Sequence, residues 1–146
     1  MDKQIIEQAA LEALSSGLSC AESVLRTAGL HLGIDTGAAT RAASCFGGGV
    51  GKSKQELCGA LAGGLMALGF AYGRDGGAES CELAYELAAE FRERFIATHG
   101  ASQCHVLLER FGPQEGWEHC RRLTAATAGL LFDLAREAGE PTPGRR

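Results

Sequence analysis

Six cysteines are the residues of this chain whose type and number point most clearly to chemistry: Cys20, Cys45, Cys58, Cys81, Cys104 and Cys120. No two of them are closer than Cys45 and Cys58, which are thirteen positions apart. Because there is no C-x-x-C pair, neither a thioredoxin-like motif nor a zinc ribbon is indicated, and no C-x-x-C-H segment is present for covalent haem attachment. Thiolates bind soft metals and iron–sulfur clusters, and they also exchange with disulfides. A site that uses these thiols must therefore be assembled from separate segments of the chain.

The segments that carry the cysteines are predicted to be helices. Alanine, leucine and glutamate dominate, β-branched residues are scarce, and only one of the three prolines lies before residue 141, so helix is favoured almost everywhere. The length of 146 residues, 45% of them hydrophobic, suits one domain with its own core. We expect an all-α, single-domain bundle of about six helices over residues 1–138 and a disordered tail over 139–146. Periodicity and caps place helices near 3–14, 20–32, 36–44, 54–72, 79–99, 102–111 and 113–138.

Cap signals predict where two of the thiols lie. Ser19 and Glu22 have the spacing of a capping box, which starts a helix at Cys20. Ser102 is suited to cap a helix that begins close to Cys104. Thiols in the first turn of a helix face the positive end of the amide dipoles, and this favours the thiolate form. A second capping-box spacing, Ser53 to Glu56, predicts the start of the helix that carries Cys58.

The helix after Ser53 is rich in small residues, including Gly59, Gly63 and Gly64. Each glycine inside a helix costs about 1 kcal/mol relative to alanine, so another helix or a cofactor is expected to come close there. Cys58 is expected to point inward from this helix. Cys81 is expected to pack in the core, because apolar residues share its side of the next helix.

Charge and hydropathy exclude several classes of partner. The net charge is −4 with both signs interspersed, so there is no basic stripe for nucleic acid and no polybasic segment for a membrane surface. No stretch approaches the ~18 apolar residues of a transmembrane helix. The acidic start at Asp2 differs from the basic start of a secretory signal. We therefore expect a cytoplasmic protein without a nucleic-acid or membrane partner.

The glycine-rich segment GGGVGKS at residues 47–53 resembles the second half of a phosphate-binding loop. The first glycine of that motif would stand at position 46, which is Phe46, and the preceding segment TRAAS is helical in character rather than a strand. Nucleotide binding and hydrolysis are therefore not expected. The loop amides are instead candidates for binding an anion or for hydrogen-bonding the sulfurs of a cluster.

Several segments around Cys58 together resemble a known family. Residues 58–63 read CGALAG, a CGAxxG motif, and the flanking segments are SCAESVL at 19–25, CFGGGVGK at 45–52, CHVLLE at 104–109 and CRRLTAATAGLL at 120–131. In order and spacing they resemble the C-GCAxxG-C-C family of redox-active proteins over roughly residues 17–132. The resemblance implies that the motif cysteines are Cys20, Cys58, Cys104 and Cys120, with Cys45 and Cys81 as additions. Glu109 stands where the family pattern has the glycine of a C-x-x-L-L-G turn.

The resemblance extends to the cluster-bearing part of split-Soret cytochromes, which implies a [2Fe–2S] centre with cysteine ligands. The implied metal ligands are Cys20, Cys58, Cys104 and Cys120. Gly59 and Gly63 would let the backbone approach the inorganic sulfides. Cys45 is a candidate substitute ligand or resolving thiol. The implied function is electron transfer or redox sensing rather than hydrolysis, with an unidentified redox partner protein and with a homodimer allowed. Two alternatives stay open, a metal-free thiol–disulfide protein and a zinc- or copper(I)-binding module.

Overall fold

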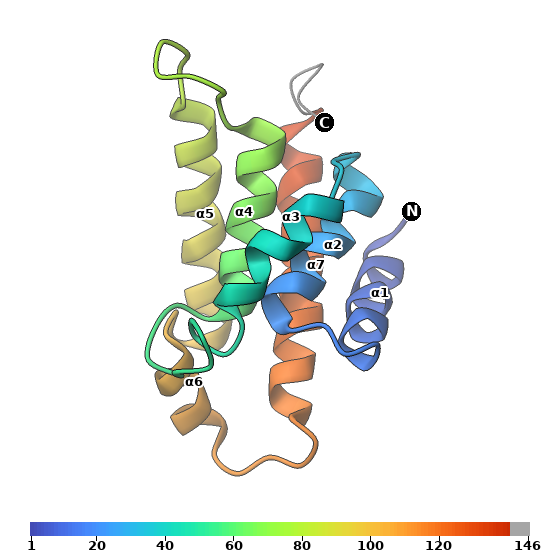
Figure 1. Cartoon of the computed structure of the whole chain (residues 1–146), viewed down its shortest axis with the longest axis vertical. Coiled ribbons are helices and arrows are strands. Elements are labelled where there is room, and N and C mark those ends of the chain that lie inside the picture. The colour runs from blue at the N-terminus through green and yellow to red at the C-terminus, as the bar shows by residue number, and fades with distance from the viewer. Residues whose placement is uncertain (141–146) are drawn as a thin grey trace.

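Helices form every regular element of residues 1–140 in the computed structural model of the chain (Figure 1). Seven α-helices and one short 3₁₀ helix occur within these residues, and the only β-type pairing there is an isolated antiparallel bridge between Leu57 and Gln103. The predicted all-α class is therefore confirmed. The elements are α1 (Lys3–Ser15), α2 (Cys20–Leu32), α3 (Gly37–Ala43), η1 (Ser44–Phe46), α4 (Gly59–Tyr72), α5 (Glu82–His99), α6 (Cys104–Phe111) and α7 (Glu118–Ala138).

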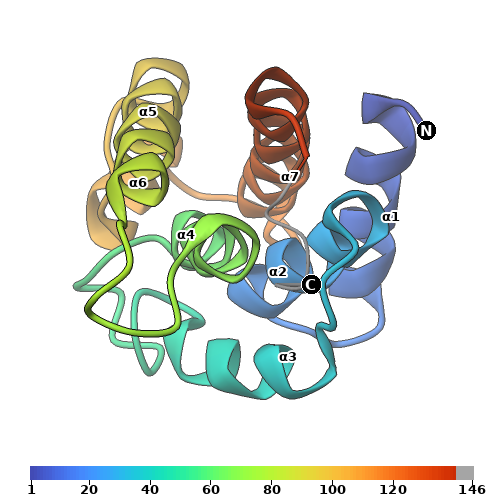
Figure 2. The same ribbon diagram turned by 90° about the horizontal axis from the view of Figure 1, so that it is seen from above.

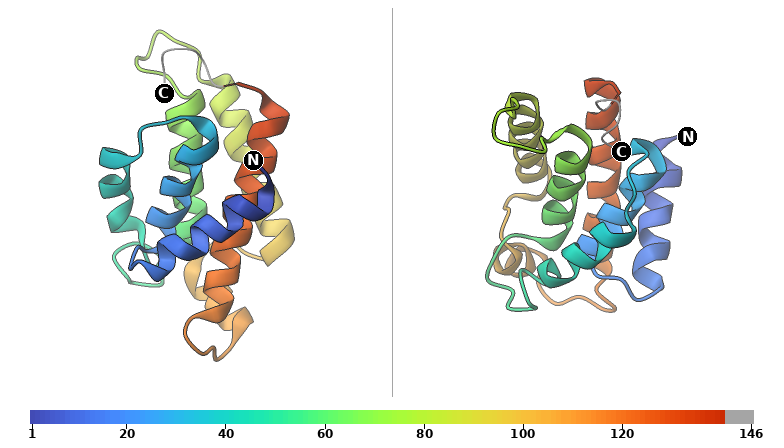
Figure 3. Two further views of the ribbon diagram at one scale, coloured as in Figure 1. Left: turned by 90° about the vertical axis from the view of Figure 1, so that its right-hand side faces the viewer. Right: turned by 45° about the horizontal axis from the view of Figure 1, so that its top comes forward.

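The centre of the bundle is the contact between α2 and α4, and Figure 2 shows the other long helices arranged around this pair. The main core contains aliphatic and aromatic side chains from α2, α4, α5 and α7, and its largest fully buried members are Phe91, Phe95, Leu25, Leu61, Leu68 and Leu131. Helix α1 lies across α7 (Figure 3) and packs through a smaller cluster of Ile6, Ala10, Ala128 and Phe132.

Two glycines of α4 permit the close packing at this centre. A Cβ placed on Gly63 would collide with the backbone of Ala21 in α2, and one placed on Gly64 would collide with the ring of Phe91 in α5. Neighbouring helices therefore explain why these positions lack a side chain. The contact of Gly63 also fixes the backbone next to Cys20.

The predicted start of α4 was wrong, because the capping box at Ser53 does not form. The Ser53 hydroxyl donates to the carbonyl of Gly49 at 2.7 Å and accepts from the amide of Gln55 at 3.2 Å. The chain then bends through residues 54–56, Leu57 pairs with Gln103, and α4 begins only at Gly59. The start of α4 is therefore set by a non-local backbone contact rather than by the local spacing of Ser53 and Glu56.

Other helix starts also shifted. α7 begins at Glu118 rather than at Pro113, after Trp117 in a left-handed conformation with φ of 58°. α5 begins at Glu82, three residues later than expected. Ser102 makes no cap, since Gln103 precedes α6 and offers no side-chain cap hydrogen bond. By contrast, the capping box before α2 forms as predicted, because the Ser19 and Glu22 side chains each accept the other residue's amide.

The predicted tail, residues 139–146, lies mostly outside the described residues, which end at 140. Gly139 is described, and its carbonyl accepts a hydrogen bond of 2.9 Å from the Tyr72 hydroxyl. No helix within residues 1–140 combines the length and the apolar character that a membrane crossing requires.

Replacing Gly63 with alanine should lower the free energy of unfolding by about 1–3 kcal/mol, because the new methyl group overpacks the α2–α4 contact. Gly69 is the matched control: it lies in the same helix, and an added Cβ would meet no atom within 4 Å. Gly69→Ala should therefore stabilise the protein by about 0.5–1 kcal/mol through helix propensity. Urea unfolding followed by circular dichroism measures both changes. Equal effects of the two substitutions would contradict the packing account.

Candidate functional site

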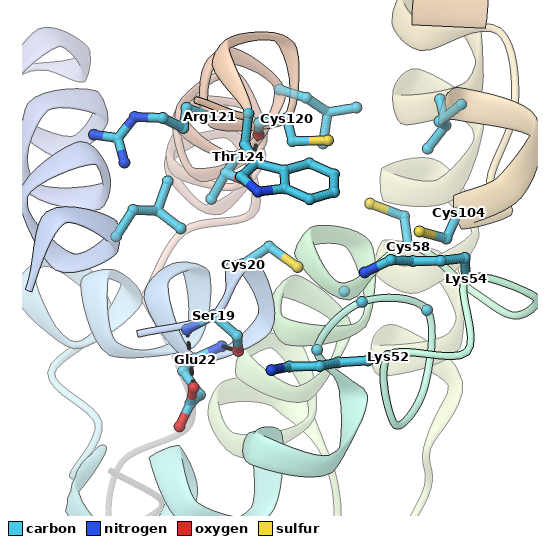
Figure 4. A pocket seen from close by; sticks show the side chains of 18 of the residues that line it. Ser19, Cys20, Glu22, Lys52, Lys54, Cys58, Cys104, Cys120, Arg121 and Thr124 are labelled. Carbon is cyan, nitrogen blue, oxygen red and sulfur yellow. Dashed lines mark hydrogen bonds between the residues drawn. The ribbon is translucent and has the colours of Figure 1, made fainter. Parts of the chain in front are cut away.

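A cavity of about 870 Å³ lies at the end of the bundle where α2, α4, α6 and α7 begin (Figures 1 and 4). One cysteine stands at each of these four N-termini. Cys20 and Cys104 are the first residues of α2 and α6, Cys58 is the N-cap of α4, and Cys120 is the third residue of α7. All four line the cavity. The expected position of Cys20 and Cys104 in the first turns of helices is confirmed.

Cys20 enters the cavity beside Gly59. A Cβ on Gly59 would collide with the Cys20 sulfur and would lie 3.0 Å from the carbonyl oxygen of Phe46. The backbone before Cys20 is held by the capping box, and Glu22 also accepts a hydrogen bond of 2.8 Å from the Ser44 hydroxyl. The absence of a side chain at Gly59 is therefore what makes room for this thiol.

Cys58 and Cys104 are brought together by the backbone. The amide of Cys58 donates to the carbonyl of Ser102 at 2.8 Å, and the amide of Cys104 donates to the carbonyl of Glu56 at 2.8 Å. These bonds flank the bridge between residues 57 and 103. Since side chains alternate along an extended segment, Cys58 and Cys104 fall on the same face of this two-strand ribbon. Figure 4 shows the two thiols side by side at one wall of the cavity.

Cys120 is held by Gln114, a residue that no sequence pattern indicated. The Gln114 side-chain oxygen accepts from the amides of His119 and Cys120 at 2.9 and 3.1 Å, and its nitrogen donates to the Cys120 sulfur at 3.3 Å. Gln114 therefore supplies the missing cap of α7 and a hydrogen bond to the thiol at once. Its position in an irregular loop between two helices carries no recognisable cap spacing.

The glycine loop covers the cavity on the side opposite Cys120. Residues 48–52 all have positive φ, and the non-glycine members Val50 and Lys52 have φ of 69° and 60°. A left-handed conformation costs an L-residue about 1–2 kcal/mol, so surrounding contacts must hold the loop in place. Gly49 lies against Cys104, where an added Cβ would come within 2.5 Å of the Cys104 Cβ.

The loop amides are turned inward rather than toward a ligand. The amides of residues 50–54 and 56 all donate to carbonyls of residues 45–50, including Gly51 to Cys45 at 2.8 Å and Lys54 to Gly48 at 2.9 Å. Because they are engaged in this way, these amides are not available to cradle a phosphate. What the loop does offer the cavity is the side chains of Lys52 and Lys54. Figure 4 shows Lys54 reaching toward Cys20 and Lys52 pointing toward Ser19.

Burial is the main influence on the protonation of the thiols. It raises the pKa of Cys58 to about 12, and the nearby thiols of Cys20 and Cys104 add to this rise, while the amides of Leu61 and Ala60 oppose it. Burial also raises the pKa values of Cys104 and Cys120. Desolvation thus opposes the thiolate form of Cys104, although this residue begins a helix, where amide dipoles favour that form.

Lys54 and Gln114 act against this rise. The Lys54 ammonium lowers the pKa of Cys104 and, less strongly, that of Cys120, whereas the hydrogen bond from Gln114 is the larger stabilising influence at Cys120. Lys54 also lies 5.4 Å from the ring centre of Trp117, a cation–π contact that joins the glycine loop to the start of α7. The site thus has positive charge and a hydrogen-bond donor ready for anionic sulfur.

The two remaining cysteines are not in the cavity. Cys45 is exposed in η1, and its side chain does not line the site. Cys81 was expected in the core, but it is half-buried at the N-cap of α5 and lies outside the core cluster. His105 and His119, each next to a motif cysteine in the sequence, also do not line the cavity.

The cavity lining offers four thiols and one carboxylate as potential metal ligands. Glu22 is the one carboxylate in the lining, and its oxygens are occupied by the capping box and by Ser44. Within residues 1–140 no three cysteine, histidine or acidic side chains converge closely enough to hold a single metal ion. All six thiols are free of disulfide bonds. The four thiols thus surround a shared space rather than one point.

Comparison with known proteins identifies the family. The chain matches the family model described as "Putative redox-active protein (C_GCAxxG_C_C)" over residues 18–134, which include all four cavity thiols. No curated protein matches the chain, and no solved structure does. Because the match covers most of the chain, this protein belongs to the C_GCAxxG_C_C family of redox-active proteins.

Proposed function

We propose that the four cavity thiols hold a [2Fe–2S] cluster and that the protein is an electron carrier or redox sensor. The observation that carries the proposal is that four separate helices each deliver one thiol to a single cavity. A set of four cysteine ligands is the usual ligand set of such a cluster, and a carboxylate that could compete is already occupied. When bound, the cluster would supply one-electron transfer, and that role requires a redox partner protein.

The arrangement of the thiols suits a group with two metal centres better than a single ion. Each iron of a [2Fe–2S] cluster takes two protein ligands. Cys58 and Cys104 form one pair on the backbone ribbon, and Cys20 and Cys120 stand on the other two helices. Cys58 and Cys104 would therefore supply one pair of ligands, and Cys20 and Cys120 would supply the other. The lack of a single point of convergence makes the zinc or copper(I) module the less favoured reading.

The protein's own groups would stabilise the negative charge of thiolate ligands. Lys54 lies near Cys104 and Cys120, Gln114 donates to the Cys120 sulfur, and the amides of Ala60 and Leu61 face the Cys58 sulfur. Hydrogen bonds and charge near cluster sulfurs tune the reduction potential. A bound metal would also turn thiols whose pKa values are raised by burial into thiolates, releasing their protons.

A metal-free thiol–disulfide function is the second candidate, because the ribbon holds Cys58 and Cys104 close to each other. Joining them would form one S–S bond, and the two protons and two electrons would pass to an oxidised disulfide partner, which is reduced to a dithiol. Reactive thiols of this kind have lowered pKa values. The raised pKa values of both residues make this reading the weaker one.

Single alanine substitutions of the six cysteines separate the two readings. Removing Cys20, Cys58, Cys104 or Cys120 should leave an iron without a ligand, so the protein purified without oxygen should lose most of its bound iron and its visible absorbance. Cys45→Ala and Cys81→Ala should retain both, with Cys81→Ala changing stability by less than about 1 kcal/mol because its side chain is only half-buried. Iron content and absorbance per chain are the measurements.

The ligand assignment is wrong if Cys20→Ala or Cys120→Ala keeps as much iron as Cys81→Ala. If neither the parent nor any variant contains iron, the thiol–disulfide reading is favoured. In that case, mild oxidation should join Cys58 to Cys104, and peptide mapping would identify the bond.

Gln114→Ala should make the reduction potential more negative. The hydrogen bond from Gln114 stabilises negative charge on the Cys120 sulfur, and that charge is greatest in the reduced state. Loss of the cap on α7 should also cost about 1 kcal/mol of stability. Gln8 is the matched control, because its side chain contacts only the exposed Glu12 at 3.5 Å. A potential that is equal in Gln114→Ala and Gln8→Ala would contradict the role of this hydrogen bond.

A further inference from the structure

The cavity is larger than the thiols and a small inorganic group require. Its volume of about 870 Å³ lies within the range of roughly 300–1,000 Å³ that is typical of pockets for small organic molecules. The thiols and glycines occupy one part of the lining. The other part is an apolar wall formed by Leu14, Leu18, Leu107, Leu108, Phe111 and Leu123.

The free charges of the cavity are positive. The chain has only three lysines, and two of them, Lys52 and Lys54, line this cavity. Neither forms an ion pair within residues 1–140, whereas Lys3, the third, pairs with Asp133 at 2.7 Å. The cavity therefore has two cations without a carboxylate partner, in a protein of net charge −4.

The other charged residues of the lining are already engaged. Arg121 turns toward α1 and donates to the Ser15 hydroxyl at 2.8 Å. Glu22 is held by the Ser19 amide and the Ser44 hydroxyl. Only the two lysines are thus available to an incoming molecule. Figure 4 shows Lys54 directed toward Cys20 and Lys52 directed toward Ser19, and both of these neighbours line the cavity.

We propose that this cavity binds an organic anion, with its anionic group at Lys52 and Lys54 and its apolar part against the leucine-rich wall. Such a molecule would lie beside the four thiols, so an organic anion is the substrate class that the redox site would act on. The binding rests on the protein's own lining residues, whereas the role of the anion as a substrate rests on the proposed redox function. The argument rests on the volume, the apolar wall and the two unpaired cations.

Trp117 offers a way to observe the binding. It is the only tryptophan of the chain, it lines the mouth of the cavity with 56% of its surface exposed, and Lys54 lies over its ring. A ligand that engages Lys54 should alter this contact. Tryptophan emission therefore comes from a residue that lines this cavity.

Two probes that share one aromatic framework distinguish the contribution of charge to binding from the contribution of apolar contact. 1-Anilinonaphthalene-8-sulfonate carries a sulfonate, and N-phenyl-1-naphthylamine is the same body without it. Calorimetric titration of the purified protein should show one site for the sulfonate, with about tenfold weaker binding of the neutral probe, because a charge-assisted contact is lost. The sulfonate should also change Trp117 emission, and raised salt should weaken its binding.

Substitution of the lysines tests the assignment to this cavity. In Lys52→Gln/Lys54→Gln, sulfonate affinity should fall about tenfold, to the level of the neutral probe, with the neutral probe unaffected. Lys3→Gln is the matched control and should leave both affinities unchanged. Circular dichroism confirms that each variant is folded.

Equal affinities for the two probes would overturn the proposal, since the cavity would then be merely apolar. Absence of sulfonate binding would overturn it as well, and so would an equal loss in Lys3→Gln. These titrations measure neither iron nor absorbance. A negative titration therefore does not contradict the cluster proposal, and the absence of a cluster does not contradict a positive titration.

Discussion

The close approach of α2 and α4 is the constraint on which the site depends. The backbone of Ala21 occupies the space where a side-chain methyl group on Gly63 would lie. One turn earlier, the lack of a side chain at Gly59 leaves room for the Cys20 sulfur. If the helices moved apart, Cys20 would withdraw from the cavity into which Cys58 points. The glycines cost helix propensity, and the packing they permit offsets that cost while it also sets the position of one thiol.

Around this contact the protein balances two opposite effects on sulfur. Helix N-termini, Lys54 and Gln114 stabilise negative charge, whereas burial destabilises it, and in the thiols of Cys58, Cys104 and Cys120 burial is the stronger effect. Burial therefore disfavours the thiolate forms of these three residues. A bound cation would favour the thiolate forms, which is the behaviour expected of a cofactor site rather than of a nucleophile.

The sequence predicted the class of fold and the start of α2, because a capping box is a local signal and the residues that form it are three apart. The same spacing at Ser53 gave a wrong start for α4, because the backbone there is positioned by the contact between Leu57 and Gln103, which no local pattern encodes. The left-handed loop through Val50 and the support of Cys120 by Gln114 were likewise not predictable. Both depend on packing between segments that are distant or irregular. The four motif cysteines were found by family resemblance, while their common cavity is a product of the tertiary fold.

The most direct test of the central claim is the ratio of iron to acid-labile sulfide to protein in the unmodified chain, purified without oxygen. The account predicts about two irons and two sulfides per chain, together with a red-brown colour. Iron without sulfide, zinc in stoichiometric amount, or a colourless protein that takes up neither iron nor sulfide on reconstitution would contradict it.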